Sequence, residues 1–102
     1  MSDALLQFLD AETRVGLDEL LRASGLAREE LNELVAYGVF EAHGEAHEWT
    51  FASRSIVLGR RAARLRSDFG LNASGMALAL TYLERIDALE RRIRELECGL
   101  LR

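Results

Sequence analysis

A chain of 102 residues, 49% of them hydrophobic, can form one small core and is too short for two ordinary domains. No apolar run approaches the ~20 residues of a membrane-spanning helix, and Met1-Ser2-Asp3 lacks the positive flank of a signal peptide. The single cysteine, Cys98, excludes an internal disulfide and agrees with a reducing compartment. We therefore expect a cytoplasmic protein that does not interact with membranes.

The net charge of −4 conceals an uneven distribution. Residues 1–51 carry three Arg against eleven Asp and Glu (−8), whereas residues 52–102 carry ten Arg against six (+4). The two halves therefore attract each other and suit different partners. An acidic half is poorly suited to a polyanion and well suited to a basic protein surface.

Residues 1–14 are predicted as an N-terminal extension. Their apolar residues fit neither helical nor strand periodicity decisively: Leu5, Leu6, Phe8 and Leu9. Thr13 to Gly16 is predicted as a short extended segment. A first helix should follow from Leu17 to Ala23, because apolar residues repeat there at helical spacing and two carboxylates occupy the first turn, where the helix dipole favours them.

A second helix is predicted from Arg28 to Tyr37, across a turn at Ser24-Gly25 that is typical of a helix-turn-helix. Its apolar residues share one narrow face and its carboxylates crowd on the opposite one: Leu31, Leu34 and Val35, against Glu29, Glu30 and Glu33. Gly38 supplies the positive φ that ends a helix. Ala27 stands where a capping Ser or Thr would stabilise the helix start by ~1 kcal/mol, so we expect this start to fray.

Val39 to Phe51 is predicted as a β-hairpin wing, with its turn at His43-Gly44-Glu45 and its return strand at Trp49-Thr50-Phe51. Both aromatic rings of the return strand can point to one face, and core packing is the favoured role for them. Three potential metal ligands would share a face of an extended wing: His43, Glu45 and His47. Because no further nitrogen or sulfur ligand lies nearby in the sequence, we expect solvated turn residues and no metal site.

A third helix is predicted from a cap at Ser53 to Phe69, with Gly70 ending it. Its apolar stripe, expected in the core, consists of Leu58, Ala62, Leu65 and Phe69. Beside that stripe lies a basic ridge, formed by Arg54, Arg60, Arg61 and Arg64, whereas Arg66 lies apart from it. The favoured interpretation of the ridge is a solvated face partly neutralised by the acidic half, and the alternative is a site for nucleic acid or another polyanion.

The longest predicted helix is capped by Asn72 and runs from Met76 to Cys98. Its apolar residues alternate spacings of three and four, as in an a/d coiled-coil seam: Ala79, Tyr82, Ile86, Leu89, Ile93, Leu96 and Leu100. We expect Met76 to Leu83 to pack on its own domain, and a homodimer seam to consist of Ile86, Leu89, Ile93 and Leu96. The charges at the g and e positions would attract in a parallel pair and repel in an antiparallel one: Arg85, Arg92, Glu90 and Glu97.

These elements, in this order, resemble the chaperone-modulator CbpM family, a branch of the MerR-like helix-turn-helix folds. The similarity covers about Val15 to Arg102, and its most specific pieces are Glu29-Glu30-Leu31-Asn32-Glu33-x-Val35-x-x-Gly38-Val39 and Leu71-Asn72-x-x-Gly75-x-Ala77-Leu78-Ala79-Leu80. The resemblance implies a mainly α fold, with a winged helix-turn-helix domain and small β-hairpin over residues 15–71 and a long C-terminal helix over residues 72–102. It also implies a protein without enzyme activity or cofactor, which binds the J-domain of a DnaJ-like co-chaperone, CbpA, and restrains its stimulation of the Hsp70 chaperone DnaK.

Two functions remain in competition. The first is a modulator whose contact surface comprises Glu29, Glu30, Glu33 and Tyr37. J-domains as a family carry a basic second helix that docks on DnaK, and an acidic helix is complementary to it. The second is a MerR-like transcriptional regulator that contacts DNA through the wing and the basic ridge.

Charge and chemistry decide between these functions. Three carboxylates beside phosphates would oppose the counterion release that supplies most non-specific DNA affinity. We therefore favour the modulator and expect nucleic-acid binding to be weak or absent. The sequence contains no recognisable set of nucleophile, base and orienting residue, so an enzyme is not expected.

Overall fold

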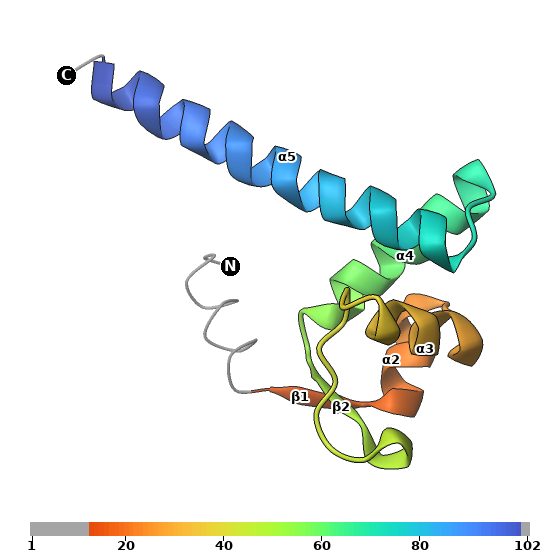
Figure 1. Ribbon diagram of the computed structural model, residues 1–102. Helices are drawn as coiled ribbons and strands as arrows, with labels where there is room; N and C mark the ends of the chain where they lie inside the picture. Colours follow the sequence, from red (N-terminus) through yellow and green to blue (C-terminus); the bar gives the residue numbers. More distant parts are fainter. Residues whose placement is uncertain (1–12, 101–102) are drawn as a thin grey trace.

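The computed structural model describes residues 13–100, which form four α-helices, a short 3-10 helix and two strands (Figure 1). In chain order these are β1 (Arg14–Gly16), α2 (Leu17–Ser24), α3 (Arg28–Ala36), η1 (Ala46–Glu48), β2 (Thr50–Ala52), α4 (Ser55–Phe69) and α5 (Ala73–Leu100). The predicted mainly α architecture, with a helix-turn-helix, a small antiparallel sheet and a long C-terminal helix, is confirmed. Residues 1–12 of the predicted N-terminal extension lie outside the described residues.

Both helices of the helix-turn-helix end at a glycine in the left-handed region. Gly25 has φ 84° and donates its N–H to the carbonyl of Leu21 at 3.0 Å. After α3, Gly38 has φ 82°, and two N–H groups bond back into the last turn: Gly38 to Val35 at 3.0 Å and Val39 to Leu34 at 2.9 Å. This pair of bonds is a Schellman motif, which satisfies the last carbonyls of α3 and turns the chain sharply.

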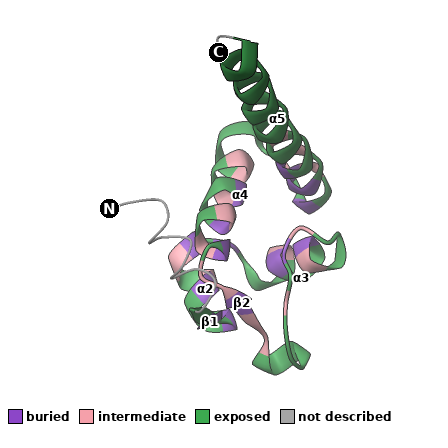
Figure 2. Cartoon of the chain, turned by 90° about the vertical axis from the view of Figure 1, so that its left-hand side faces the viewer, coloured by how far each residue is buried: buried purple, intermediate pink, exposed green. Residues whose placement is uncertain are grey.

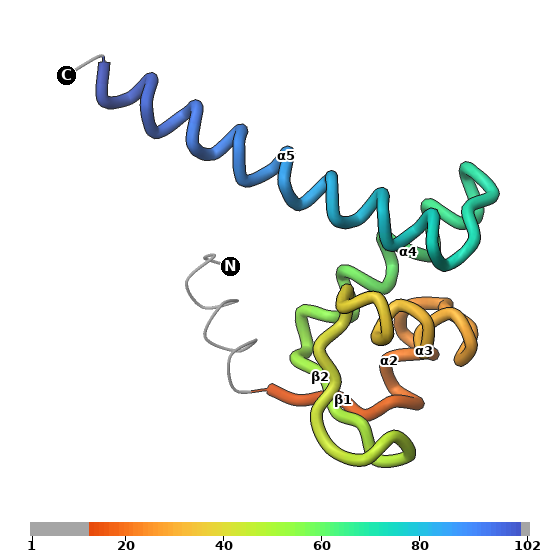
Figure 3. Tube along the Cα trace, viewed as in Figure 1, coloured from red at the N-terminus to blue at the C-terminus, as the bar shows by residue number. Residues whose placement is uncertain are grey.

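The sheet pairs segments that are far apart in the sequence. β1 and β2 are antiparallel, with Val15 opposite Phe51, so the predicted extended segment before the first helix is one of the two strands. The predicted wing is smaller than expected, because no strand forms directly after Val39. The two sides of the wing pair only at His43 and Thr50, which exchange two backbone hydrogen bonds of 3.0 and 2.9 Å. After this bridge the chain continues into β2, which lies beside β1 (Figure 3).

The core gathers where α2, α3 and β2 meet the first turns of α5 (Figure 2). Its largest fully buried side chains are Phe51, Leu20, Leu31, Leu34 and Met76. The Phe51 ring makes edge contacts with Phe40 and Trp49, at centroid distances of 6.3 and 6.1 Å. The predicted role of these aromatics in core packing is therefore confirmed for Phe51, which is buried, and for Trp49, which packs half-buried against it.

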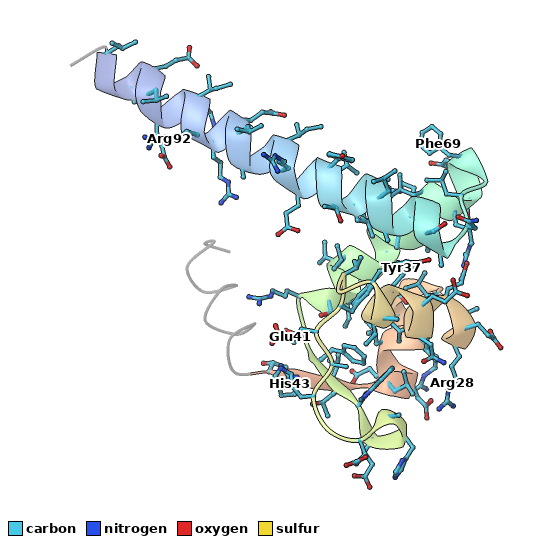
Figure 4. The ribbon with its side chains drawn as sticks, in the orientation of Figure 1. Arg28, Tyr37, Glu41, His43, Phe69 and Arg92 are labelled. Carbon is cyan, nitrogen blue, oxygen red and sulfur yellow. The ribbon has the colours of Figure 1, made fainter. Side chains whose placement is uncertain are left out.

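Helix α4 ends at Phe69 before Gly70, as predicted, but it differs from the prediction in its N-cap residue and in the exposure of Phe69. It begins at Ser55, with Arg54 as the N-cap residue in place of Ser53. Phe69, predicted to be in the core, is 71% exposed, because the helix has run past the domain by its last turn and Gly70 (φ 66°) then turns the chain toward α5. In Figure 4, Phe69 lies at the outer corner of the α4–α5 turn. The residues that α4 does bury are small: Ser55, Gly59 and Ala62.

Helix α5 starts under a side-chain cap and then leaves the domain. The Asn72 carboxamide oxygen accepts the Gly75 N–H at 2.9 Å, as predicted for a cap. The buried residues of α5 all lie in its first turns: Ala73, Met76, Ala77 and Leu80. From Glu84 to Leu100 every residue is exposed, and Figure 1 shows this part of α5 projecting from the other elements. The predicted packing of the first half on its own domain is therefore seen.

The tight contact between α2 and α4 gives a stability prediction. A Cβ atom added to Gly59 would lie 2.6 Å from the Ser24 Cβ, which is too close for two carbon atoms that are not bonded to each other. We expect Gly59→Ala to destabilise the fold by about 1–3 kcal/mol through overpacking. Its melting temperature, measured by circular dichroism, should fall by roughly 4–8 °C per kcal/mol.

Gly99→Ala is the matched control, because this glycine is also helical and a Cβ there would meet nothing within 4 Å. It should be neutral or slightly stabilising, as helix propensity predicts. Adding Ser24→Gly to Gly59→Ala removes the clashing atom and should recover part of the loss. A Gly59→Ala protein as stable as the parent would contradict the contact.

Candidate interaction surfaces

The outer side of α3 is an acidic face, defined by Glu29 and Glu33. Both are exposed, whereas Leu31 and Leu34 on the other side of the helix are fully buried. Tyr37 caps the C-terminal end of α3, is 57% exposed and lies at the opposite end of the helix from Arg28 (Figure 4). No residue of α3 after Arg28 is basic. The helix that reads DNA in other helix-turn-helix proteins therefore presents mainly carboxylates here.

Glu30 does not belong to this acidic face, contrary to the sequence-based expectation. Its carboxylate forms a close ion pair with Arg66 of α4, and the Glu30 side chain retains only 21% of its exposure. The same Oε1 accepts the Ala27 N–H at 2.9 Å, which is half of a capping box, so the start of α3 is held although Ala27 cannot cap it. Arg66 also donates to the Gly25 carbonyl at 3.3 Å. Glu30 and Arg66 are therefore structural residues.

The acidic surface continues past the start of α3. A groove of about 420 Å³ is bounded by the first turn of α2, by Arg28 and by the wing. Its carboxylates come from Asp18 and Glu19 of α2 and from Glu48 of the wing, and the half-buried ring of Trp49 lines it. Carboxylates beside an aromatic ring are a suitable environment for a Lys or Arg side chain.

Two arginines of the predicted basic ridge have intramolecular partners. Arg60 donates from Nε to the Ala23 carbonyl at 3.0 Å, near the C-terminal end of α2, where the helix dipole favours a cation. Arg61 lies 3.7 Å from Asp87 of α5, in an ion pair whose side chains are half-exposed. Arg54, the N-cap residue of α4, and Arg64 are exposed, and neither makes an ion pair within residues 13–100. Two of the four arginines of the predicted ridge, Arg60 and Arg61, thus make contacts within the fold.

The histidines of the wing pair with neighbouring carboxylates. His43 lies 3.6 Å from Glu41, and His47 lies 3.8 Å from Glu48, all on exposed side chains. Within the part of the chain that the structure describes, no group of three or more His, Cys, Asp and Glu side chains is placed to hold a metal ion.

The projecting part of α5 carries an exposed apolar stripe. At about 100° per residue, its members lie roughly opposite Leu80, which faces the core. The stripe contains the predicted seam and begins earlier, at Leu78: Leu78, Tyr82, Ile86, Leu89, Ile93, Leu96 and Leu100. Apolar side chains that are about half-exposed along six turns are unusual for a surface helix and indicate a binding face.

Sequence reasoning missed two features of these surfaces. Leu78 was not included in the predicted seam, because the a/d series was started at Ala79. Its spacing of four residues from Tyr82 is a helical spacing that could have identified it. The Glu30–Arg66 pair had no local signal, because the two residues are 36 positions apart and come together only when α3 packs beside α4.

None of the helices within residues 13–100 is long and apolar enough to cross a membrane.

Comparison with known proteins agrees with this arrangement. A family model described as "MerR HTH family regulatory protein" matches residues 15–98. The chaperone modulatory protein CbpM of Citrobacter koseri is 37% identical over 79 residues, which cover 76% of this chain and 78% of that protein. CbpM of Salmonella arizonae is 37% identical over 81 residues, which cover 78% and 80% of the two chains. The chain therefore belongs to the CbpM family of chaperone modulatory proteins, within the MerR-type helix-turn-helix group.

Proposed function

We propose that this protein binds the J-domain of a DnaJ-like co-chaperone of the CbpA type and inhibits its stimulation of DnaK. The acidic face of α3, Glu29 and Glu33 with Tyr37 beside them, is the proposed contact, and its target is the basic helix with which a J-domain docks on DnaK. Because one helix of the J-domain cannot serve both partners, binding and inhibition would be the same event. The proposal places the protein in the cytoplasm, and its single cysteine agrees with a reducing compartment.

The observation that carries this proposal is the unpaired charge of α3. Within the described residues, Glu29 and Glu33 have no ion pair, although ten arginines lie in the second half of the sequence. An acidic patch beside a partly buried aromatic groove attracts a basic partner and orients it. The names of the CbpM relatives, which describe modulators of chaperones, support the same class of partner.

We also propose that the protein is a homodimer joined through the exposed stripe of α5. The stripe faces away from the domain of its own chain, so a second copy could cover it without displacing any core residue. Its seam would comprise Ile86, Leu89, Ile93 and Leu96, extended by Leu78 and Tyr82.

A DNA-binding regulator is the second candidate, favoured by the description of the matching family model. Its contacts would come from the wing and from the basic ridge. The commitment of Arg60 to Ala23 and of Arg61 to Asp87 weakens this candidate, because these guanidinium groups would have to exchange existing partners for phosphates.

Charge reversal on α3 tests the proposed contact. Glu29→Arg with Glu33→Arg should change the free energy of unfolding by no more than about 0.5 kcal/mol, since both side chains are on the surface. The double variant should weaken binding to the J-domain by at least ~30-fold, which corresponds to about 2 kcal/mol. Calorimetry would measure the affinity, and DnaK ATPase stimulation would show whether inhibition is lost in parallel.

Two controls accompany this experiment. Glu45→Arg with Glu95→Arg makes the same change in net charge away from α3 and should bind nearly as tightly as the parent. Arg54→Glu with Arg64→Glu alters the basic ridge and should matter less than the α3 variant. If the ridge variant abolishes binding while the α3 variant binds normally, the contact lies on the other half of the molecule.

The dimer seam is tested by Leu89→Ser with Ile93→Ser. Each buried Leu or Ile is worth about 1.5–3 kcal/mol, so four such losses per dimer should raise the dimer Kd by at least ~100-fold. Arg91→Ser with Arg94→Ser lies on the other side of α5 and should leave the dimer intact. Light scattering at tens of micromolar would report the molar mass, and a monomeric parent chain would refute the dimer.

Binding to duplex DNA should be weak and indifferent to sequence. Only four arginines of the ridge could reach phosphates, so the slope of log K against log salt concentration should be no steeper than about −4. Titration of labelled duplexes at several salt concentrations would measure it. If a palindromic DNA site that binds tightly were selected from a random library, the protein would be a DNA-binding regulator and the modulator proposal would be wrong.

A further inference from the structure

The turn between α2 and α3 is held by two arginine side chains of α4. Arg60 donates from Nε to the Ala23 carbonyl at 3.0 Å, near the end of α2. Arg66 donates from Nη2 to the Gly25 carbonyl at 3.3 Å. The guanidinium of Arg66 also reaches beyond the turn, to the Glu30 carboxylate in the first turn of α3. One side chain therefore connects α4, the turn and α3.

The Glu30 carboxylate holds the first turn of α3 in place of an N-cap side chain. Ala27 has the extended backbone of an N-cap residue, with φ −78° and ψ 154°, but its methyl group cannot accept a hydrogen bond. Glu30 Oε1 accepts the Ala27 N–H at 2.9 Å, and the same oxygen pairs with Arg66. The side chains of Glu30 and Arg66 retain 21% and 34% of their exposure, so the ion pair is partly shielded from water. Arg66 therefore fixes the carboxylate on which the start of α3 depends.

The first turn of α3 carries one of the two carboxylates of the acidic face. Glu29 lies in that turn beside Glu30, and Glu33 lies one turn later. Residues four positions apart on a helix have their Cβ atoms about 5–6 Å from each other, so Glu29 and Glu33 form a pair with a defined spacing. If the first turn unwinds, Glu29 leaves the helix and this spacing is lost. The geometry of the acidic face thus depends on contacts that lie outside it.

We propose that Arg66 is a positioning residue for the acidic face: through Glu30 it holds the first turn of α3 and keeps Glu29 at a fixed distance from Glu33. This role rests on the proposed function, because the J-domain is the basic partner that the acidic face would bind. A held first turn raises the affinity, since a partner that binds an unwound segment must also supply the free energy of ordering it.

Electrostatics alone predicts the opposite effect for Arg66. Removal of a cation next to an acidic face makes the face more negative and should tighten the binding of a basic partner. Removal of the Glu30 carboxylate should weaken binding on the same grounds. If Arg66 and Glu30 act together by holding the first turn, the loss of either side chain weakens binding. The sign of the change at Arg66 therefore separates positioning from a direct effect of charge.

Calorimetry with the J-domain of the cognate DnaJ-like protein tests this role, at a temperature at which circular dichroism shows every variant to be folded. Arg66→Gln and Glu30→Ala should each weaken binding about five-fold, the usual worth of a helix cap. The double variant should bind no more weakly than the single ones, because both changes break the same contact. Arg64→Gln is the matched control and should bind like the parent. It removes the same charge from the same helix, at an exposed residue that has no ion pair within residues 13–100.

An independent cap shows whether Arg66 acts through the start of α3. Ala27 is exposed and already has N-cap backbone geometry, so Ala27→Ser introduces a hydroxyl that can accept an N–H of the first turn. Added to Arg66→Gln, this change should restore most of the affinity without restoring the ion pair. Parent-like or tighter binding by Arg66→Gln overturns the proposal, and so does a loss of affinity that Ala27→Ser leaves unchanged.

Amide hydrogen exchange measures the same hold without a partner. The Leu31 N–H, which bonds to the Ala27 carbonyl at 3.0 Å, reports on the first turn of α3. It should exchange about five times faster in Arg66→Gln than in the parent, and Ala27→Ser should slow it again. An unchanged Leu31 rate overturns the positioning role even if the J-domain binds. If the rates change as expected but the parent does not bind the J-domain, Arg66 holds the start of α3 and the proposed function is wrong.

Discussion

The packing of α2 on α4 is the contact on which the other surfaces depend. Gly59 lets the two helices approach until Ser24 fills the space that a side chain would need. Two arginines of α4 then reach the end of α2 and its turn, Arg60 at the Ala23 carbonyl and Arg66 at the Gly25 carbonyl. The turn of the helix-turn-helix is thus held by hydrogen bonds from side chains of α4. Because the turn is fixed, the direction of α3 is fixed as well, and its apolar side must face the core.

Few ion pairs within the described residues join the acidic and basic halves of the sequence. Arg66 forms an ion pair with Glu30 of α3, whereas Arg61 pairs with Asp87 from its own half of the chain. The remaining carboxylates of α3 stay in solvent, where an ion pair within the chain would contribute less than about 1 kcal/mol. The same carboxylates can contribute more against a basic partner that excludes water from them. The fold therefore pairs one carboxylate of α3, that of Glu30, and leaves Glu29 and Glu33 exposed to solvent.

The features that were predicted correctly are those that depend on interactions between residues close together in the sequence. The limits of α3, its glycine stop at Gly38 and the Asn72 cap follow from periodicity and from capping chemistry, which act over a few residues. Non-local pairing was not predictable in the same way. β2 pairs with β1 across more than thirty residues. The start of α4 one residue later than predicted, with Arg54 in place of Ser53 as the N-cap, and the exposure of Phe69 depend on where that packing ends. The acidic face was predicted with one carboxylate too many, because the Arg66 partner of Glu30 lies 36 positions away in the sequence. The position of Glu30 in the first turn, where its carboxylate accepts the Ala27 N–H, was the only local sign of its structural role.

Helix α5 has two apolar faces, one that packs in the core and one that is exposed and available to the proposed second copy. Ala73, Met76, Ala77 and Leu80 anchor it through the side that faces α3 and α4. The exposed stripe begins at Leu78, within the anchored part, and continues on the other side of the helix to its end. A copy bound along that stripe would rest on a helix that the core already holds, so little conformational entropy would remain to be lost at the start of the seam. The domain of each chain would then lie on the outside of the pair, and the acidic face of α3 would stay open to its partner.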